Sequence, residues 1–191
     1  MEGVRPITKL RNERIRYLDE DERKALLAAC KTSHNRQIYP IVVFALSTGA
    51  RRGEILGLTL DDVDLERGVA IFRNTKNTDT RAAPILGHLR DVLEHQIHWV
   101  KETHKGMEPP PPRRWLFPSQ NGQAPIDIRR PWEMARDAAG LVDFRFHDLR
   151  HSTASYLAMS GASQLEIAEV LGHRTLQMVK RYAHLSESHV K

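Results

Sequence analysis

Apolar residues recur at helical spacing through most of this chain, and the pattern predicts a mainly α-helical domain. Asp19 followed three residues later by Glu22 is typical of a helix N-cap. Leu26, Leu27 and Cys30 then give the following helix one apolar face. We therefore expect the ordered domain to begin near residue 17.

Further helices are predicted by the same spacing. Residues 38–47 are almost all apolar, which indicates a buried helix that ends at Gly49. Residues 51–58 restart as a helical segment, and residues 87–101 form an amphipathic pattern. From residue 129 onward the chain is predicted to be helical. Breaks in this last region are expected at Gly140, Gly161 and Gly172.

A small sheet is predicted between the helices. Residues 69–72 and 81–85 are strand candidates, joined by a polar hairpin tip at 74–79. Pro84 cannot donate to a ladder, so the second strand is expected at an edge. Residues 115–117 form a third short apolar candidate. The expected fold class is mixed, mainly α with a small antiparallel β-sheet.

The chain divides into one domain with short polar ends. Residues 1–16 are basic and are expected to be a linker or tail, either solvated or binding phosphate. Residues 17–184 carry the apolar patterning of one domain, and residues 185–191 form a short C-terminal tail. A chain of 191 residues is long enough for a single core of ordinary size.

Composition narrows the function classes. The formal net charge of +5 suits a polyanionic partner, because Lys and Arg that neutralise phosphates release counterions. A single cysteine, Cys30, excludes an intrachain disulfide and a thiolate cluster for zinc. No apolar run reaches the length of a membrane span, so a cytoplasmic location without membrane contact is expected. His95, His98 and His104 fit the polar face of a surface helix better than a metal site.

Arginines at two places have the chemistry needed to bind a phosphate diester. Arg51 follows Thr48-Gly49-Ala50 and precedes Glu54, so a glycine turn could direct it into a cleft. Arg150 lies three residues after His147, which puts both on one face of a helix. Planar guanidinium groups stabilise the charge on phosphate oxygens, and an imidazole accepts a proton near neutral pH. Taken singly, each of these residues is more often a surface or packing residue.

A tyrosine near the C-terminus supplies a nucleophile. Tyr182 stands in Lys-Arg-Tyr-Ala-His, soon after Leu-Gly-His at 171–173. A phenol has a pKa near 10, so it needs nearby cations and a proton acceptor before it attacks. No glycine-rich nucleotide loop accompanies it, and no acidic cluster resembles a two-metal nuclease.

Together these segments resemble the catalytic domain of the tyrosine recombinases, the phage-integrase family. The match is carried by Thr-Gly-Ala-Arg at 48–51, by His-Asp-Leu-Arg-His at 147–151, and by the Leu-Gly-His and Tyr182 segments. It covers almost all of residues 17–184 and implies the recombinase catalytic-domain fold. The site residues that the resemblance implies are Arg51, Lys76, His147, Arg150, His173 and Tyr182.

The resemblance also implies a reaction. Tyr182 would attack a DNA phosphate and form a 3′-phosphotyrosyl link, while Arg51, Arg150 and His173 hold the phosphate. His147 would assist proton transfer, and Lys76 on the hairpin would protonate the leaving 5′ oxygen. His151 and Asp148 are expected only to shape their helix. Neither a metal, ATP nor another cofactor is required.

The implied partner is double-stranded DNA, with a tetramer of the full-length protein assembled on it. Accessory DNA-bending proteins are compatible with this interpretation. The phage-like sequences of the motifs favour integration or excision of a phage or other mobile element. Two alternatives stay open. One is strand cleavage of the type IB topoisomerase kind, and the other is a catalytically silent DNA-binding module.

Overall fold

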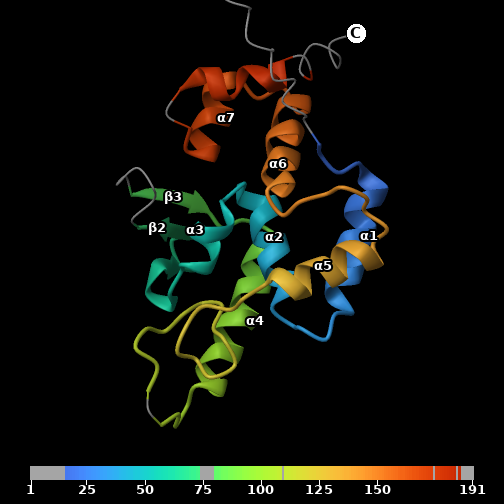
Figure 1. The fold of residues 1–191 in the computed structure, drawn as a ribbon. Helices are drawn as coiled ribbons and strands as arrows, with labels where there is room; N and C mark the ends of the chain where they lie inside the picture. Colours follow the sequence, from blue (N-terminus) through green and yellow to red (C-terminus); the bar gives the residue numbers. More distant parts are fainter. Residues whose placement is uncertain (1–15, 74–79, 109, 174, 184, 186–191) are drawn as a thin grey trace, which may run out of the picture.

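The computed structural model describes residues 16–73, 80–108, 110–173, 175–183 and 185 (Figure 1). Most of the expected linker at 1–16, most of the tail at 185–191, and Lys76 lie outside these described residues. Arg16 is described and packs on the domain: it pairs with Glu22 and lies 5.2 Å from the centre of the Phe144 ring. No helix in the described ranges is long and apolar enough to cross a lipid bilayer.

The first two helices form as predicted. The cap of α1 (Glu20–Lys31) is reciprocal: the Glu22 backbone N–H donates to Asp19 Oδ1 at 2.8 Å, and the Asp19 N–H donates to Glu22. Helix α2 (Ile38–Thr48) is buried along most of its length and ends at Gly49, whose φ of 62° is left-handed.

A three-stranded antiparallel sheet lies beside the short helix α3 (Arg52–Leu56). Its strands are β1 (Val63–Asp64), β2 (Val69–Phe72) and β3 (Arg81–Pro84), in the order β1-β2-β3, with Phe72 opposite Arg81. A 3₁₀ turn, η1 (Leu60–Asp62), precedes β1. The expected edge position of Pro84 is confirmed.

The third strand candidate, at residues 115–117, is wrong. Trp115 forms only an isolated bridge to Thr59. The Leu116 N–H donates to Leu58 O, and the Leu116 carbonyl accepts from the buried Gln96 side chain, both at 2.8 Å. A loop backbone and a side-chain amide thus satisfy this segment in place of a neighbouring strand. Gln96 belongs to α4 (His88–Thr103), the predicted amphipathic helix.

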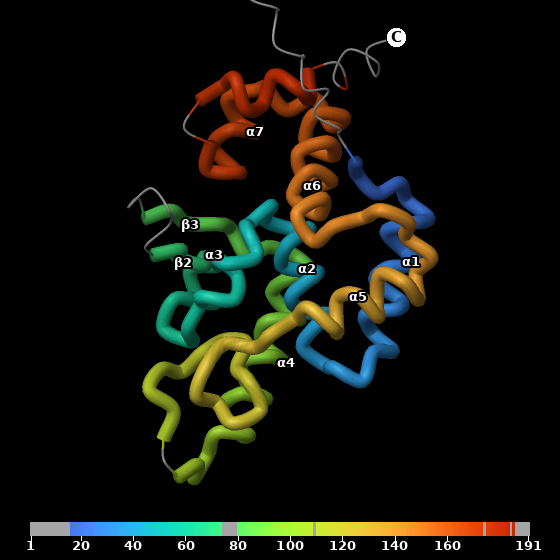
Figure 2. Tube along the Cα trace, viewed as in Figure 1, coloured from blue at the N-terminus to red at the C-terminus, as the bar shows by residue number. Residues whose placement is uncertain are grey.

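The C-terminal half contains α5 (Arg129–Ala138), α6 (Asp148–Met159) and α7 (Gln164–Leu171), followed by the 3₁₀ turns η2 (Leu176–Met178) and η3 (Lys180–Tyr182). Helices α2 and α6 pack together although they are far apart in sequence (Figure 2). Gly140, Gly161 and Gly172 break the helices as predicted, each with positive φ.

Helix α6 joins two hydrophobic cores. Leu149, at its start, belongs to the main core under α1, α2, α4 and the sheet. Ala154 and Ala158, further along, belong to a second small core with α7 and Tyr182. The turn of α6 that carries Arg150 and His151 therefore lies where the two cores meet.

Candidate active site

Arg150 is anchored by backbone carbonyls at the C-terminal ends of two other helices, α2 and α7. It is only 4% exposed, and its Nη1 and Nη2 donate to Gly49 O and Leu171 O, both at 2.7 Å. Burial, with the nearby charges of Arg51 and Arg81, lowers the pKa of Arg150 to about 10. The group is still charged at neutral pH. A guanidinium has five N–H donors, so three remain for an anion after these two carbonyls are satisfied.

Glu54 connects the other two arginines of the site. Its carboxylate accepts from Arg51 Nη1 and Arg81 Nη2, both at 2.9 Å. Burial alone would raise the pKa of Glu54, but Arg81 and Arg51 hold it below its usual range. Arg81 also donates to Val170 O at 3.0 Å and lies over the Phe72 ring. The carboxylate therefore fixes the position of Arg51, whose side chain stays 35% exposed.

Tyr182 is buried and meets a histidine. Its hydroxyl is hydrogen-bonded to Nδ1 of His151, and the side chain is 2% exposed. Burial, together with the neighbouring His147, lowers the pKa of His151 to about 4. The imidazole is therefore neutral at pH 7, which suits it to accept a hydrogen bond from the phenol.

His147 stands at the first turn of α6, edge-on to His151 with ring centres 5.1 Å apart. Partial burial and the positive charge of Arg150 lower its pKa, although part of the side chain reaches solvent. The neutral ring can therefore accept a proton at neutral pH. His147 and Arg150 both line a cavity of about 330 Å³, with Arg52 at its rim.

His173 follows the left-handed Gly172 at the end of α7, and its N–H donates to Ala168 O at 2.8 Å. Its Nδ1 is buried and has no hydrogen-bond partner. Burial and the charges of Arg150 and Arg51 lower its pKa to about 4. A buried ring nitrogen without a partner, close to two guanidinium groups, can bind an anion as an N–H donor in the tautomer that carries the proton on Nδ1.

Five of the six predicted site residues are thereby brought into one electrostatic neighbourhood, and the sixth, Lys76, lies outside the described residues. Two contributors were missed: Arg81, which pairs with Glu54, and His151, which contacts Tyr182. The expectation that His151 only shapes its helix does not account for that contact. In the described part of the chain, no group of three His, Cys, Asp or Glu side chains is placed to hold a metal ion.

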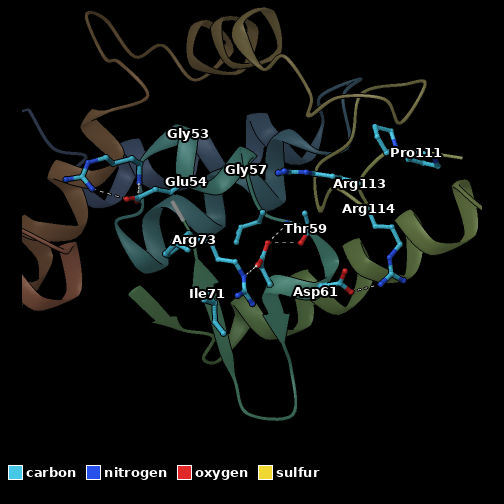
Figure 3. Close-up of a pocket in the computed structure, with 15 residues that line it drawn as sticks. Gly53, Glu54, Gly57, Thr59, Asp61, Ile71, Arg73, Pro111, Arg113 and Arg114 are labelled. Carbon is cyan, nitrogen blue, oxygen red and sulfur yellow. Dashed lines mark hydrogen bonds and ion pairs between the residues drawn. The ribbon is translucent and has the colours of Figure 1, made fainter. Parts of the chain in front are cut away.

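A large open cavity of about 950 Å³ adjoins the exposed side of Arg51 (Figure 3). Two of its arginines are already paired with carboxylates: Arg73 with Asp62 at 2.7 Å and Arg114 with Asp61 at 2.5 Å. Its positive charge is therefore largely balanced from within.

The arrangement is suited to nucleophilic attack on a tetrahedral anion. Two arginines and a histidine lie close enough to interact electrostatically, and a phenol hydrogen-bonded to a neutral imidazole belongs to the same group. Preorganised donors of this kind stabilise charge that develops on non-bridging oxygens. Mainly helical packing around a small antiparallel sheet, with this site at the junction of two cores, defines the tyrosine-recombinase catalytic-domain class.

Comparison with known proteins agrees with that class. Residues 16–189 match the model of the phage integrase family, and the chain belongs to this family. The integrase of Salmonella phage P22 is 34% identical over 97% of this chain and 48% of its own length. A shufflon-specific DNA recombinase of Escherichia coli is 31% identical over 93% of this chain and 42% of its own.

Solved structures give the same result. The catalytic domain of bacteriophage HP1 integrase is 32% identical with a TM-score of 0.72, covering 93% of this chain and 92% of that one. The XerA recombinase has a TM-score of 0.76 at 26% identity, covering all of this chain and 64% of that one. The chain thus spans about half the length of the curated relatives, and nearly all of the HP1 catalytic domain.

Proposed function

We propose that this chain is the catalytic domain of a site-specific DNA recombinase that cleaves and rejoins double-stranded DNA through a 3′-phosphotyrosyl intermediate. The observation that carries the proposal is the meeting of Tyr182 with His151 beside Arg150, from segments that are 31 positions apart. Membership of the phage integrase family supports it. Integration or excision of a phage or other mobile element is the role proposed for the full-length protein.

In the proposed reaction, the Tyr182 oxygen bonds to the scissile phosphorus and the bond from phosphorus to the 5′ oxygen breaks. Arg51, Arg150 and His173 bind the non-bridging oxygens, where charge accumulates in the transition state. The phenol loses its proton and the departing 5′ oxygen gains one, so charge and atoms balance. The phosphotyrosyl ester conserves the bond energy, and a 5′ hydroxyl can reverse the step.

The proton steps fall to the histidines and to Lys76. We propose that neutral His151 orients the phenol in the resting site and that neutral His147 accepts its proton as the phosphate binds. The motif resemblance supports Lys76 as the donor to the 5′ oxygen. Tyr182 is only 2% exposed, so we propose that it leaves its buried position to reach a bound phosphate.

Partners of the full-length protein are proposed on the same basis. Solved relatives with this fold include a XerH recombinase bound to its difH substrate and a Tn1549 integrase bound to circular-intermediate DNA. We propose double-stranded DNA as the substrate of this chain, with a tetramer as the recombining assembly and a cytoplasmic site of action.

The test is covalent capture. The protein is incubated with nicked suicide duplexes that carry candidate attachment sites, in the presence of EDTA, and adducts are resolved on a denaturing gel. We expect an adduct that is absent in Tyr182→Phe and strongly reduced in Arg150→Ala. Tyr156→Phe is the matched control, since the Tyr156 hydroxyl donates to Leu18 O on another face of α6.

An adduct that persists in Tyr182→Phe would rule out the assigned nucleophile. Binding of the same duplex without any adduct would favour the silent DNA-binding module. An adduct on supercoiled DNA that leads only to relaxation, without strand exchange between two duplexes, would favour topoisomerase-like cleavage.

A further inference from the structure

A groove on the α5 side of the candidate site is lined by arginines without acidic partners. The 330 Å³ cavity that holds His147 and Arg150 shares Arg52, Arg145 and Phe146 with a second cavity of about 180 Å³. The second cavity continues along α5 to Arg129. The two cavities therefore form one continuous path that starts at the phosphate-binding arginine.

The charge of this path is not balanced from within. Arg52, Arg129 and Arg145 are all exposed, and across the described part of the chain none of them lies within ion-pair distance of a carboxylate. Only Arg136, further along the wall, is neutralised, by Asp137 at 2.6 Å. One carboxylate, Glu133, also lines the second cavity.

The floor of the path is apolar. Trp132 and Phe146 are 6% and 8% exposed and pack edge to face with ring centres 5.1 Å apart. The contact between the two rings joins α5 to the segment before α6, so Arg129 and Arg145 stand on two elements that pack together. A row of exposed, unpaired guanidinium groups over an apolar floor suits an extended polyanion better than a single small anion.

The larger cavity on the opposite side of Arg51 provides the contrast. Figure 3 shows Arg73 and Arg114 directed at carboxylates of their own wall. Of the four arginines that line that cavity, Arg51, Arg73 and Arg114 are paired with carboxylates, and only Arg113 has no ion pair within the described residues. The charge distribution therefore favours the α5 side.

We propose that the groove formed by Arg52, Arg129 and Arg145 binds the DNA backbone next to the scissile phosphate and so sets the register of the strand in the site. The inference rests on the proposed function, because it takes Arg150 as the scissile-phosphate ligand. Arg51 and Arg52 are neighbours in sequence but line different cavities, so Arg52 and not Arg51 belongs to this groove. Such contacts position the duplex and carry no direct sequence information.

The test is the salt dependence of binding. The chain with Tyr182→Phe, which forms no covalent product, is titrated against a fluorescein-labelled mixed-sequence duplex at several KCl concentrations, and the slope of log affinity against log salt is measured. Each lost phosphate contact lowers the magnitude of this slope by about 0.9. We expect the triple variant Arg52→Gln, Arg129→Gln, Arg145→Gln to lower it by about 2 to 3.

The matched control removes the same charge elsewhere. Arg67, Arg90 and Arg114 are exposed and each is paired with a carboxylate, so their triple change to Gln should alter the slope by less than one contact. Equal losses in both triple variants, or an unchanged slope in the groove variant, would overturn the inference.

The two proposals can fail separately. Covalent capture by the otherwise wild-type chain together with equal slopes would reject the groove and retain the recombinase chemistry. No capture, together with a selective loss of slope in the groove variant, would retain the groove as a DNA-binding surface and reject the chemistry. Thermal midpoints close to that of the unmodified chain establish that the exposed substitutions leave the fold intact.

Discussion

Arg150 and His151 are consecutive residues with opposite electrostatic requirements. Arg150 must stay charged while buried, and it does so because two backbone carbonyls accept from it at 2.7 Å. His151 must stay neutral to accept from the Tyr182 hydroxyl, and burial beside His147 lowers its pKa to about 4. The same turn of α6 thus supplies both the buried arginine proposed to bind the phosphate and the histidine that contacts Tyr182.

Replacing Arg150 with lysine keeps the charge but removes the planar fork. We expect single-turnover formation of the covalent adduct to fall by about 10²- to 10³-fold, the usual cost of losing one transition-state donor. Stability should also fall by about 1–3 kcal/mol, because a buried carbonyl of Gly49 or Leu171 loses its donor. Urea unfolding measures the second effect separately. Exposed Arg114→Lys should change neither quantity, and an Arg150→Lys rate equal to wild type would contradict the assignment.

Changing His151 tests its role as a positioning residue. Phenylalanine at 151 keeps the volume but cannot accept from the phenol, so we expect capture to slow by about 10²-fold. Glutamine retains an acceptor and should recover much of the rate. A structural role alone would predict that both variants lose activity in proportion to their lost stability, which thermal unfolding of the same samples would reveal.

At the scale of elements, local signals predicted what local interactions determine. The α1 cap needs only Asp19 and Glu22, and the end of α2 needs only Gly49, so both were correctly predicted. The strand expected at 115–117 failed because its backbone partners, Leu58 and Gln96, come from distant segments. The motif resemblance predicted a set of site residues, but it could not show that His151 meets Tyr182 or that Arg81 reaches Glu54 across 27 positions. Those contacts depend on how α6, α7 and the sheet pack.

Gly49 links element geometry to the site. It ends α2 with φ of 62°, its carbonyl accepts from Arg150, and an added Cβ would lie 2.4 Å from Leu171 Cδ2. We expect Gly49→Ala to destabilise the fold by about 2–5 kcal/mol, combining left-handed strain of about 1–2 kcal/mol with overpacking of about 1–3 kcal/mol.

Gly140→Ala is the matched control for this prediction. Its φ is 68°, but an added Cβ would meet nothing within 4 Å, so only the strain cost of about 1–2 kcal/mol applies. Urea denaturation of both variants gives the comparison. Equal losses would show that contact with Leu171 contributes nothing.

For the molecule as a whole, the lowered pKa values of several side chains predict that the folded state loses stability as the pH falls. Burial lowers the pKa of His151 and of His173 to about 4, below the ordinary 6.5, so the unfolded chain binds more protons than the folded one between those values. The stability that depends on these neutral histidines is present above pH 6.5 and is lost as pH falls toward 4. Glu54 and Asp62 have pKa values below their usual range despite burial, because arginines and other hydrogen-bond donors stabilise the carboxylates, and their protonation extends the loss to lower pH.

We therefore expect the thermal midpoint to fall by several degrees between pH 7 and pH 5, at roughly 2–4 °C for each kcal/mol lost in a chain of this size. The variant His151→Phe separates the histidine contribution from that of the carboxylates: it removes one titrating imidazole and should flatten the curve between pH 6.5 and about 4, while the slope below pH 4 stays the same. A bound phosphate analogue such as vanadate should favour the protonated form of any histidine that contacts it and so reduce the same acid loss. A midpoint independent of pH between 7 and 5 would mean that the folded and unfolded chains bind the same number of protons in that range, so that burial does not lower the pKa of His151 and His173.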